Sequence, residues 1–355
     1  MKDRIVLAYT GDATTSVAIA WLSQQYAAEV VALTLDLGQG SELEGVRDRA
    51  LASGAVRAHV LDVREEFARG YLLPSLQAGV LCRDGYPMGA ALARPLIAKT
   101  LVEVAGIEHA TAIAHGEADA SDAAALETLV RGLNAGLPLL APVREWAMTA
   151  DEAVEYARLH GVLVSAVARG RECVNLWGRS VPVANSTDRR ADAVESRFVL
   201  TRSGTDGPET PASVAIGFEH GIPVSVNGVP MPLTELIESL TLIAGQHGVG
   251  RLEWTAPRQD GTVHHEISEA PAAHVLHSAH AEVEALVLPK DLVAVQHELC
   301  LPYTDLIRDG RWFTPLREAL DTFHTKVQAP VTGMSVVQLF QGQARLIAPE
   351  MVSHA

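Results

Sequence analysis

The chain has 355 residues, 48% hydrophobic residues and a formal net charge of −15. This length suggests about two domains with sizeable cores. The negative charge repels polyanions and no basic stretch interrupts it, so nucleic acid is not expected as a partner. No stretch reaches the roughly 18 uninterrupted apolar residues that a membrane span needs. The N-terminus lacks a signal peptide's apolar centre, so we expect a cytoplasmic protein that does not bind membranes.

The first half of the chain alternates short apolar runs with amphipathic segments. This is the pattern of a parallel α/β sheet. Strands are predicted at residues 5–8, 30–35, 56–61, 110–114 and 137–140, and helices at residues 15–26, 43–53, 65–76 and 122–133. We therefore expect a doubly wound parallel sheet with helices between its strands.

The pattern changes at residues 162–170, where a polar and irregular region begins that continues to residue 211. We place a domain boundary there, giving domains at residues 1–165 and 166–355. In the second domain the sequence predicts helices at residues 233–247 and 315–323 and strands at residues 263–267 and 335–340. This mixture indicates an α+β domain.

Nine short motifs carry a resemblance to a known family. They are AYTG (8–11), DLGQG (36–40), YPMGAALARPLIAK (86–99), AHG (114–116), NLWGRS (175–180), IGFEHGIP (216–223), GQHGVGR (245–251), EAP (269–271) and WFTPLREAL (312–320). In this order and spacing they resemble the argininosuccinate synthases, ATP-dependent ligases that join citrulline to aspartate. The resemblance implies a nucleotide-binding domain of the PP-loop, or adenine nucleotide alpha hydrolase, type and a second synthetase and assembly domain.

The family's C-terminal arm helps to build a tetramer. This chain ends at Ala355, soon after the family's late strands. We expect most of the arm to be absent. A homo-oligomer is still expected, with a dimer favoured over the family's tetramer.

The loop after the first strand departs from the family's phosphate-binding sequence SGGLDTS. The aligned residues are Thr10, Gly11, Asp12, Ala13, Thr14, Thr15 and Ser16. Asp12 stands at a glycine position, and Thr14 replaces a carboxylate. Two unit charges about 4 Å apart interact by roughly 4 kcal/mol at an effective dielectric constant near 20. We therefore expect no cofactor, with ATP and magnesium bound only if Asp12 is tolerated; the alternative is that Asp12 caps the next helix.

A second altered loop follows the strand at residues 110–114 and reads HGEADASDAAALET from His115 to Thr128. His115 and Gly116 match the family. The resemblance places the family's aspartate-binding positions on Ala118, Asp122 and Ala123 and a citrulline-contacting arginine position on Leu126. Among the citrulline contacts Tyr86 and Ser180 match, whereas the family's residues are changed at Ala91, Arg171, Ala256 and Ser268.

New carboxylates accompany these losses. Asp12, Glu117, Asp119 and Asp122 are expected to converge near the strand ends, because the carboxyl ends of parallel strands share one edge. Uncompensated carboxylates need a partner, so this cluster predicts an amine, a guanidinium or a hard divalent cation as ligand, with Glu117, Asp119 and Asp122 binding substrate. The alternative is a solvated, helix-capping acidic loop.

Three residues are the candidates for proton transfer. His115 can act as a general acid or base near neutral pH, and Tyr86 and Asp12 can assist it. His274, His277 and His280 recur every third residue, but that spacing drifts around a helix, so no metal site is expected.

The sequence therefore favours a repurposed enzyme of specialised metabolism. Its expected substrate is citrulline-, arginine- or amine-like, and its expected chemistry lacks normal ATP activation. Two alternatives stay open. One is a noncatalytic pseudoenzyme that binds a metabolite or a partner, and the other is the ordinary ATP-dependent citrulline–aspartate ligase.

Overall fold

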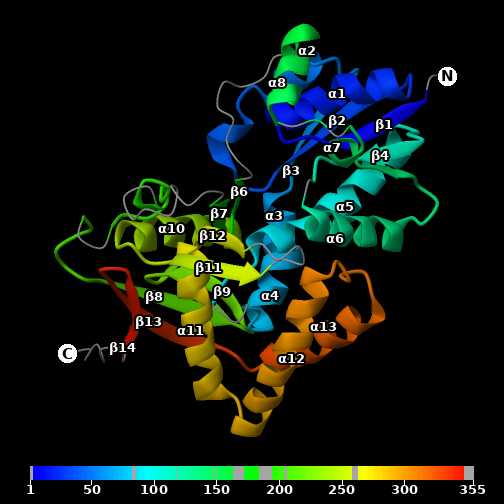
Figure 1. The fold of residues 1–355 in the computed structure, drawn as a ribbon. Helices are drawn as coiled ribbons and strands as arrows, with labels where there is room; N and C mark the ends of the chain where they lie inside the picture. Colours follow the sequence, from blue (N-terminus) through cyan, green and yellow to red (C-terminus); the bar gives the residue numbers. More distant parts are fainter. Residues whose placement is uncertain are drawn as a thin grey trace, which may run out of the picture. The chain divides into compact units, whose positions relative to one another are not determined.

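The computed structural model describes residues 3–81, 85–117, 119–146, 148, 150–162, 172–183, 194–203, 206–257 and 263–347 (Figure 1). The chain forms two compact units. The first comprises residues 1–64, 91–169 and 306–315, and the second comprises residues 65–90, 170–305 and 316–355. The domain boundary predicted near residue 165 lies outside the described residues.

A five-stranded parallel sheet forms the centre of the first unit, as the sequence predicts. Its order is β3-β2-β1-β4-β5 (Figure 1). The strands are β1 (Arg4–Ala8), β2 (Glu29–Asp36), β3 (Arg57–Asp62), β4 (Ala112–Ala114) and β5 (Leu139–Leu140), and every pairing is parallel. The β1 and β2 runs are buried because both faces of a parallel sheet are covered.

Helices connect these strands and fill the first core. They are α1 (Ala13–Gln25), η1 (Gly40–Leu43), α2 (Val46–Ala52), α5 (Gly89–Ile107), α6 (Ala120–Leu133), α7 (Pro142–Glu145) and α8 (Ala150–Leu159). Ile19 and Leu22 of α1 are fully buried and pack with Leu7 of β1 and Ala50 of α2. Burial of such a side chain contributes roughly 1.5–3 kcal/mol, which fixes α1 against the sheet.

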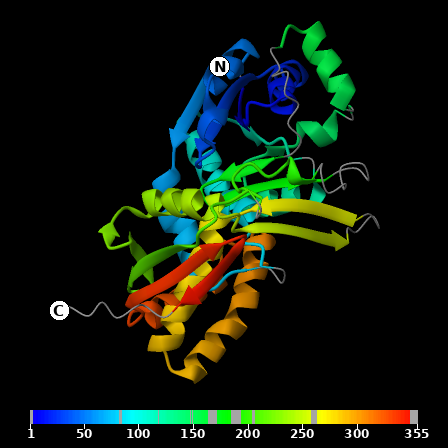
Figure 2. The same cartoon turned by 90° about the vertical axis from the view of Figure 1, so that its left-hand side faces the viewer.

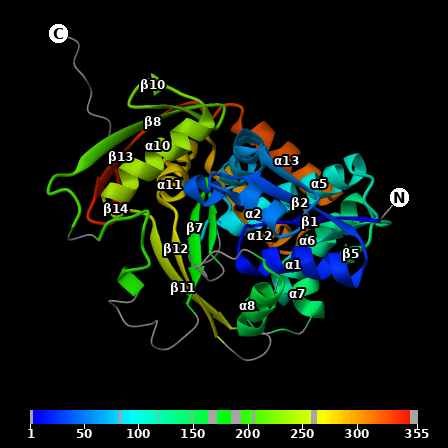
Figure 3. The same ribbon diagram turned by 90° about the horizontal axis from the view of Figure 1, so that it is seen from above.

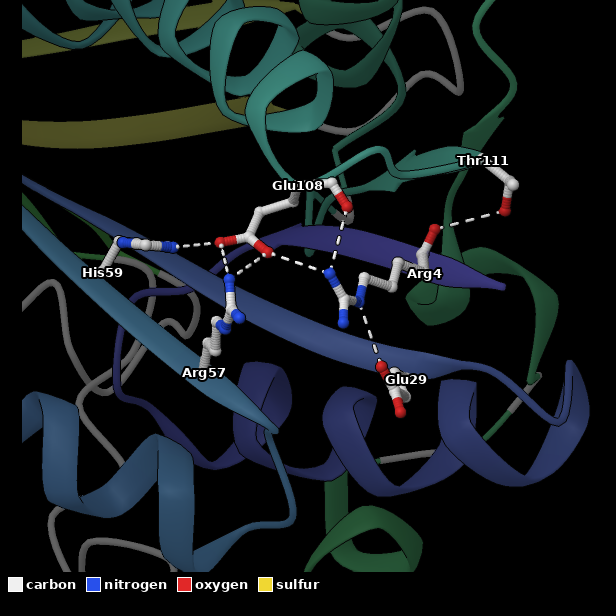
Figure 4. A network of polar contacts seen from close by, with 6 residues as sticks. All are labelled: Arg4, Glu29, Arg57, His59, Glu108 and Thr111. Atoms are coloured by element: carbon white, nitrogen blue, oxygen red, sulfur yellow. Dashed lines mark hydrogen bonds and ion pairs between the residues drawn. The ribbon is translucent and has the colours of Figure 1, made fainter. Parts of the chain in front are cut away.

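A buried carboxylate joins the amino ends of the parallel strands. Glu108, which follows α5, receives hydrogen bonds from Arg57 at the start of β3 and from Arg4 at the start of β1 (Figure 4). His59 lies 2.9 Å from its other oxygen, and Arg4 also reaches Glu29 of β2. The network ties three strands together at the edge opposite the loops that were predicted to bind ligand.

Two antiparallel sheets form the second unit. One has the order β10-β9-β8-β13-β14 and the other β11-β12-β7-β6. The strands are β6 (Cys173–Asn175), β7 (Gly178–Pro182), β8 (Ala212–Glu219), β9 (Ile222–Val226), β10 (Val229–Pro230), β11 (Arg251–Pro257), β12 (Val263–Glu269), β13 (Gly333–Phe340) and β14 (Gln343–Ile347). Figure 2 shows β11 and β12 as a pair of long yellow arrows running in opposite directions.

The helices of the second unit are α3 (Arg64–Phe67), η2 (Ala68–Leu72, one turn of π-helix), α4 (Leu73–Gln77), α10 (Leu233–Gln246), α11 (Pro271–Val287), α12 (Lys290–Arg308) and α13 (Pro315–Gln328). Figure 3 shows α10 and α11 alongside β8 and β13. No helix among the described residues is long and apolar enough to cross a membrane. The fold is the expected parallel α/β domain followed by an α+β domain.

Candidate functional site

The two loops singled out by the sequence lie side by side in the first unit. The strand order reverses at β1, because β2 pairs with one side of β1 and β4 with the other. Ligands of open α/β sheets bind at such a switch point, outside the carboxyl ends of the strands. A Cβ on Gly116 would lie 2.8 Å from Cγ2 of Thr15, so the β4 loop passes directly against the start of α1.

The loop after β1 is held by backbone conformation and by hydroxyl groups. Gly11 has φ +83°, and a Cβ there would lie 2.9 Å from Cγ2 of Val46, so glycine is required. Thr10 and Thr15 share a hydrogen bond of 3.0 Å between their hydroxyl groups, and Ser16 and Tyr9 share one of 2.9 Å. These contacts fix the conformation of the loop.

Asp12 is the N-cap of α1. Its Oδ1 accepts hydrogen bonds from the backbone N–H of Thr15 at 2.7 Å and from the Thr15 hydroxyl at 2.8 Å. An aspartate N-cap satisfies one of the four free N–H groups at a helix start. Among the described hydrogen bonds, none uses the N–H groups of Ala13 and Thr14, which open the helix. Two backbone donors and the positive end of the helix remain for an anion.

The carboxylates of the second loop also have partners within the protein. Asp119 is the N-cap of α6 and accepts hydrogen bonds from the N–H groups of Ser121 and Asp122. Asp122 forms a close ion pair with Arg94 of α5. Asp12 and Asp119 therefore serve as helix caps and Asp122 is paired with a cation, so none of the three requires a cationic ligand.

His115 is a buried histidine at the end of β4. Its Nδ1 accepts a hydrogen bond from the N–H of Glu117 at 3.2 Å, and its Nε2 lies 3.8 Å from Oε1 of Glu127. Burial lowers its pKa to about 4, although the charge of Glu127 acts in the opposite direction. The ring is therefore neutral at pH 7, with Nδ1 the acceptor and Nε2 the protonated nitrogen.

Tyr86 and Ser180 come together in the second unit. Both line a small hollow of about 10 Å³ together with Asn175, Trp177 and Ser268. Ser180 of β7 pairs directly with Ser268 of β12, which explains how residues distant in sequence reach one place. Their role in substrate binding stays a prediction. Arg171 and Ala118 lie outside the described residues, as does the side chain of Ala256.

Two charged residues of this region were missed by reasoning from the sequence. Arg94 pairs with Asp122, and Glu127 is held by Arg131 and Arg144 beside His115. Arg94 lies within the family motif at residues 86–99, so the sequence did contain a signal that could have marked it as a site residue. Glu127 precedes Arg131 by four residues, a spacing that places both on one helix face, but that pattern is common on solvated helices.

Comparison with known proteins decides the family. The model of the arginosuccinate synthase N-terminal HUP domain matches residues 4–163, and that of the C-terminal domain matches residues 173–353. The chain belongs to the argininosuccinate synthase family. Argininosuccinate synthase from Symbiobacterium thermophilum is 45% identical over 97% of this chain and 86% of its own length. The argininosuccinate synthase from Oceanobacillus iheyensis is 42% identical over 98% of this chain and 84% of its own length. The one from Rubrobacter xylanophilus is 43% identical over 96% of this chain and 84% of its own length.

These matches correct the function predicted from the sequence. A repurposed argininosuccinate synthase homologue without normal ATP activation was the favoured reading, and it is wrong. Relatives that cover the chain nearly end to end at 42–45% identity are argininosuccinate synthases. The prediction gave the charge of Asp12 too much weight, because Oδ1 of Asp12 caps helix α1 and the loop keeps free N–H groups beside it.

Proposed function

We propose that this protein is an ATP-dependent ligase that joins citrulline to aspartate. The observation that carries the proposal is the 42–45% identity to argininosuccinate synthases over 96–98% of the chain. Similarity of this extent covers both units rather than the nucleotide-binding fold alone. We therefore expect this chain to synthesise argininosuccinate, as the name of the relatives states, with ATP as cosubstrate.

The loops of the first unit suit the phosphates of ATP. The N–H groups of Ala13 and Thr14 remain available at the start of α1, and helix N-termini bind phosphate well. Gly11 and Gly116 allow the two loops to pass close to their neighbours, because a Cβ would lie 2.9 Å from Val46 at the first position and 2.8 Å from Thr15 at the second. We infer that ATP, with its magnesium ion, binds at this edge of the sheet.

The amino-acid substrates are assigned by resemblance and by position. Tyr86 and Ser180, at one hollow of the second unit, are proposed to contact citrulline. Asp122 occupies a position that binds aspartate in the family, and here it neutralises Arg94. We propose that this ion pair opens when aspartate binds, so that Arg94 receives a carboxylate of the substrate.

His115 is proposed to position the loop rather than to transfer protons. A ring with a pKa of about 4 is a weak base at pH 7. Its hydrogen bond from the N–H of Glu117 fixes the turn that carries Gly116. We also expect the chain to assemble as a homo-oligomer.

Product formation tests the proposal directly. Purified protein incubated with citrulline, aspartate and magnesium ATP should form argininosuccinate, detected by mass spectrometry, together with pyrophosphate. Omitting any one of the three substrates should abolish the product. If the complete mixture gave no argininosuccinate, while the enzyme from Symbiobacterium thermophilum gave it under the same conditions, the proposed function would be wrong.

A further inference from the structure

A cationic side chain of helix α2 lies against the loop that follows β1. The side chain is that of Arg49, which is partly buried. Val46 and Ala50 of the same helix are 1% and 0% exposed, so α2 is fixed to the core of the first unit. A Cβ on Gly11 would lie 3.0 Å from Nη2 of Arg49 and 3.6 Å from its Nε. The guanidinium therefore packs directly against the residue that precedes Asp12.

Two glycines leave the space that this guanidinium occupies. Gly45, the N-cap of α2, has φ +66°, and a Cβ there would lie 3.3 Å from Nη1 of Arg49. Gly11 has φ +83°, and such positive values disfavour any residue with a side chain. Nη1 also donates a hydrogen bond of 2.8 Å to the carbonyl oxygen of Glu44. The position of the positive charge is therefore set by backbone on two sides.

The buried hydroxyl of Tyr9 feels both Arg49 and Asp12. Tyr9 is 3% exposed, and its hydroxyl shares a hydrogen bond of 2.9 Å with Ser16 of the loop. Burial raises the pKa of Tyr9, and the hydrogen bond with Ser16 opposes this effect. The charge of Arg49 also acts to lower this pKa, whereas the charge of Asp12 acts to raise it. The two opposite charges thus lie within interaction range of one atom of the loop's support, and their fields partly cancel there.

Other arginines at the carboxyl edge of the sheet have contacts elsewhere. Arg94 pairs with Asp122 of α6, and Arg64 lies 2.7 Å from Asp62 at the end of β3. Neither of these ion pairs involves the loop of residues 9–16. Arg49 is therefore the arginine that the described contacts place against this loop.

We propose that Arg49 is a positioning residue of the phosphate loop, whose charge offsets that of Asp12 and so favours the binding of ATP. The inference rests on the proposed function, because it takes the triphosphate to bind at this loop. Arg49 acts across the backbone of Gly11 and does not touch the phosphates. The carboxylate can then cap α1 without making the start of the helix repel an anion.

Calorimetric titration with magnesium ATP tests the role of this charge. Arg49→Met keeps much of the length of the side chain and should raise the Kd for ATP roughly threefold or more, and Arg49→Glu should raise it further. Arg49→Lys keeps the charge and should stay within about twofold of wild type. Arg47→Met is the matched control, since Arg47 is exposed on the same helix and the net charge changes equally. Its Kd should also stay within about twofold.

Salt separates an effect of charge from an effect of loop shape. The ratio of the Kd of Arg49→Met to that of wild type should fall as the salt concentration rises from about 50 mM to about 500 mM, because ions screen the charge of a partly exposed residue. A role in packing alone would give a ratio that does not change with salt. Melting temperatures identify any variant that does not fold, and Arg49→Gln, whose amide can donate to the carbonyl of Glu44, replaces Arg49→Met in that event.

The outcomes for this residue and for the ligase are distinct. A Kd for ATP that is the same in Arg49→Met and wild type would overturn the inference, even if argininosuccinate is formed. Equal weakening by Arg49→Lys and Arg49→Met would overturn it too, as would a wild-type protein that binds no ATP. Weakening that follows the charge of residue 49 would support it, even if the complete mixture gave no argininosuccinate.

Discussion

Oδ1 of Asp12 lies 2.7 Å from the backbone nitrogen of Thr15 and caps helix α1 at the point where an ATP phosphate is proposed to bind. The carboxylate of Asp12 therefore stabilises the helix and, at the same position, disfavours the binding of phosphate. Its hydrogen bond stabilises the helix start, while its charge opposes phosphate. These two effects can be separated by substitution.

Asp12→Asn should lower the KM for ATP by roughly threefold or more, because it removes the charge at a site where charge opposes phosphate. Asparagine caps helices as well as aspartate does, so the melting temperature should stay nearly constant. Steady-state kinetics with ATP varied, at saturating citrulline and aspartate, measures this. Asp12→Gly is the companion variant and should lower the KM likewise, at a cost of a few tenths of a kcal/mol in stability. An unchanged or higher KM in both variants would show that the carboxylate does not oppose ATP.

The ion pair between Asp122 and Arg94 leads to a prediction about aspartate. Asp122→Asn removes the partner of Arg94, whose side chain is 12% exposed, and leaves its charge for the substrate. We expect the KM for aspartate to fall several-fold and the KM for citrulline to stay within about twofold. Initial rates with each amino acid varied in turn provide the measurement. A rise in the KM for aspartate would mean that Asp122 itself contacts the substrate.

Glu108 should make a measurable contribution to the stability of the first unit. Glu108→Gln removes the charge that receives hydrogen bonds from Arg57 and His59 and should lower the free energy of unfolding by about 2 kcal/mol. Chemical denaturation at pH 7 measures this. Glu103→Gln is the matched control on α5, because its side chain is 57% exposed and its contact with Lys99 is long, so a change within about 0.5 kcal/mol is expected.

The same carboxylate should give the stability an acid dependence. Burial acts to raise the pKa of Glu108, but the hydrogen bonds and charges of His59 and Arg57 outweigh it, so the pKa is lowered in the folded protein. A lowered carboxyl pKa contributes stability that is present above the unfolded-state pKa and is lost as pH falls through the folded-state pKa. Wild type should therefore lose more stability than Glu108→Gln between pH 5 and pH 3. Parallel denaturation curves for the two proteins over this range would contradict the prediction.

Sequence reasoning predicted the first unit well because its signals are local. The strands at residues 30–35 and 5–8 are continuous apolar runs, which is how buried parallel strands read. The hairpin of β8 and β9 was missed, although Val214, Ile216 and Phe218 alternate inward and both turn residues, His220 and Gly221, have positive φ. The long helices α5, α11 and α12 were also missed, since α5 and α12 contain internal prolines.

The adjacency of the two loops was predicted from the sequence, but the interactions within them were not. The adjacency of the β1 and β4 loops follows from parallel topology, which the alternating pattern indicated. Whether Asp12 points along its own helix or toward a ligand depends on one side-chain rotamer, and the partner of Asp122 lies 28 residues away on another helix. Neither is encoded in local periodicity. A change of residue type therefore shows where a site differs from its family, but it does not show whether function is lost.

His115 provides the sharpest test of how the β4 loop works. If the ring only fixes the turn through Nδ1, His115→Asn should reduce kcat by no more than about tenfold, because an amide oxygen can accept the same N–H; loss of a general base typically costs about 10²–10⁴-fold. Since burial lowers its pKa to about 4, His115 remains neutral while the unfolded chain takes up a proton below about pH 6.5. Wild-type stability should therefore fall as pH decreases from 6.5 toward 4, and the variant should show less of this dependence. Rate–pH profiles and denaturation curves for both proteins test the two parts, and loss of an ionisation near neutral pH from the profile of the variant would instead establish His115 as the base.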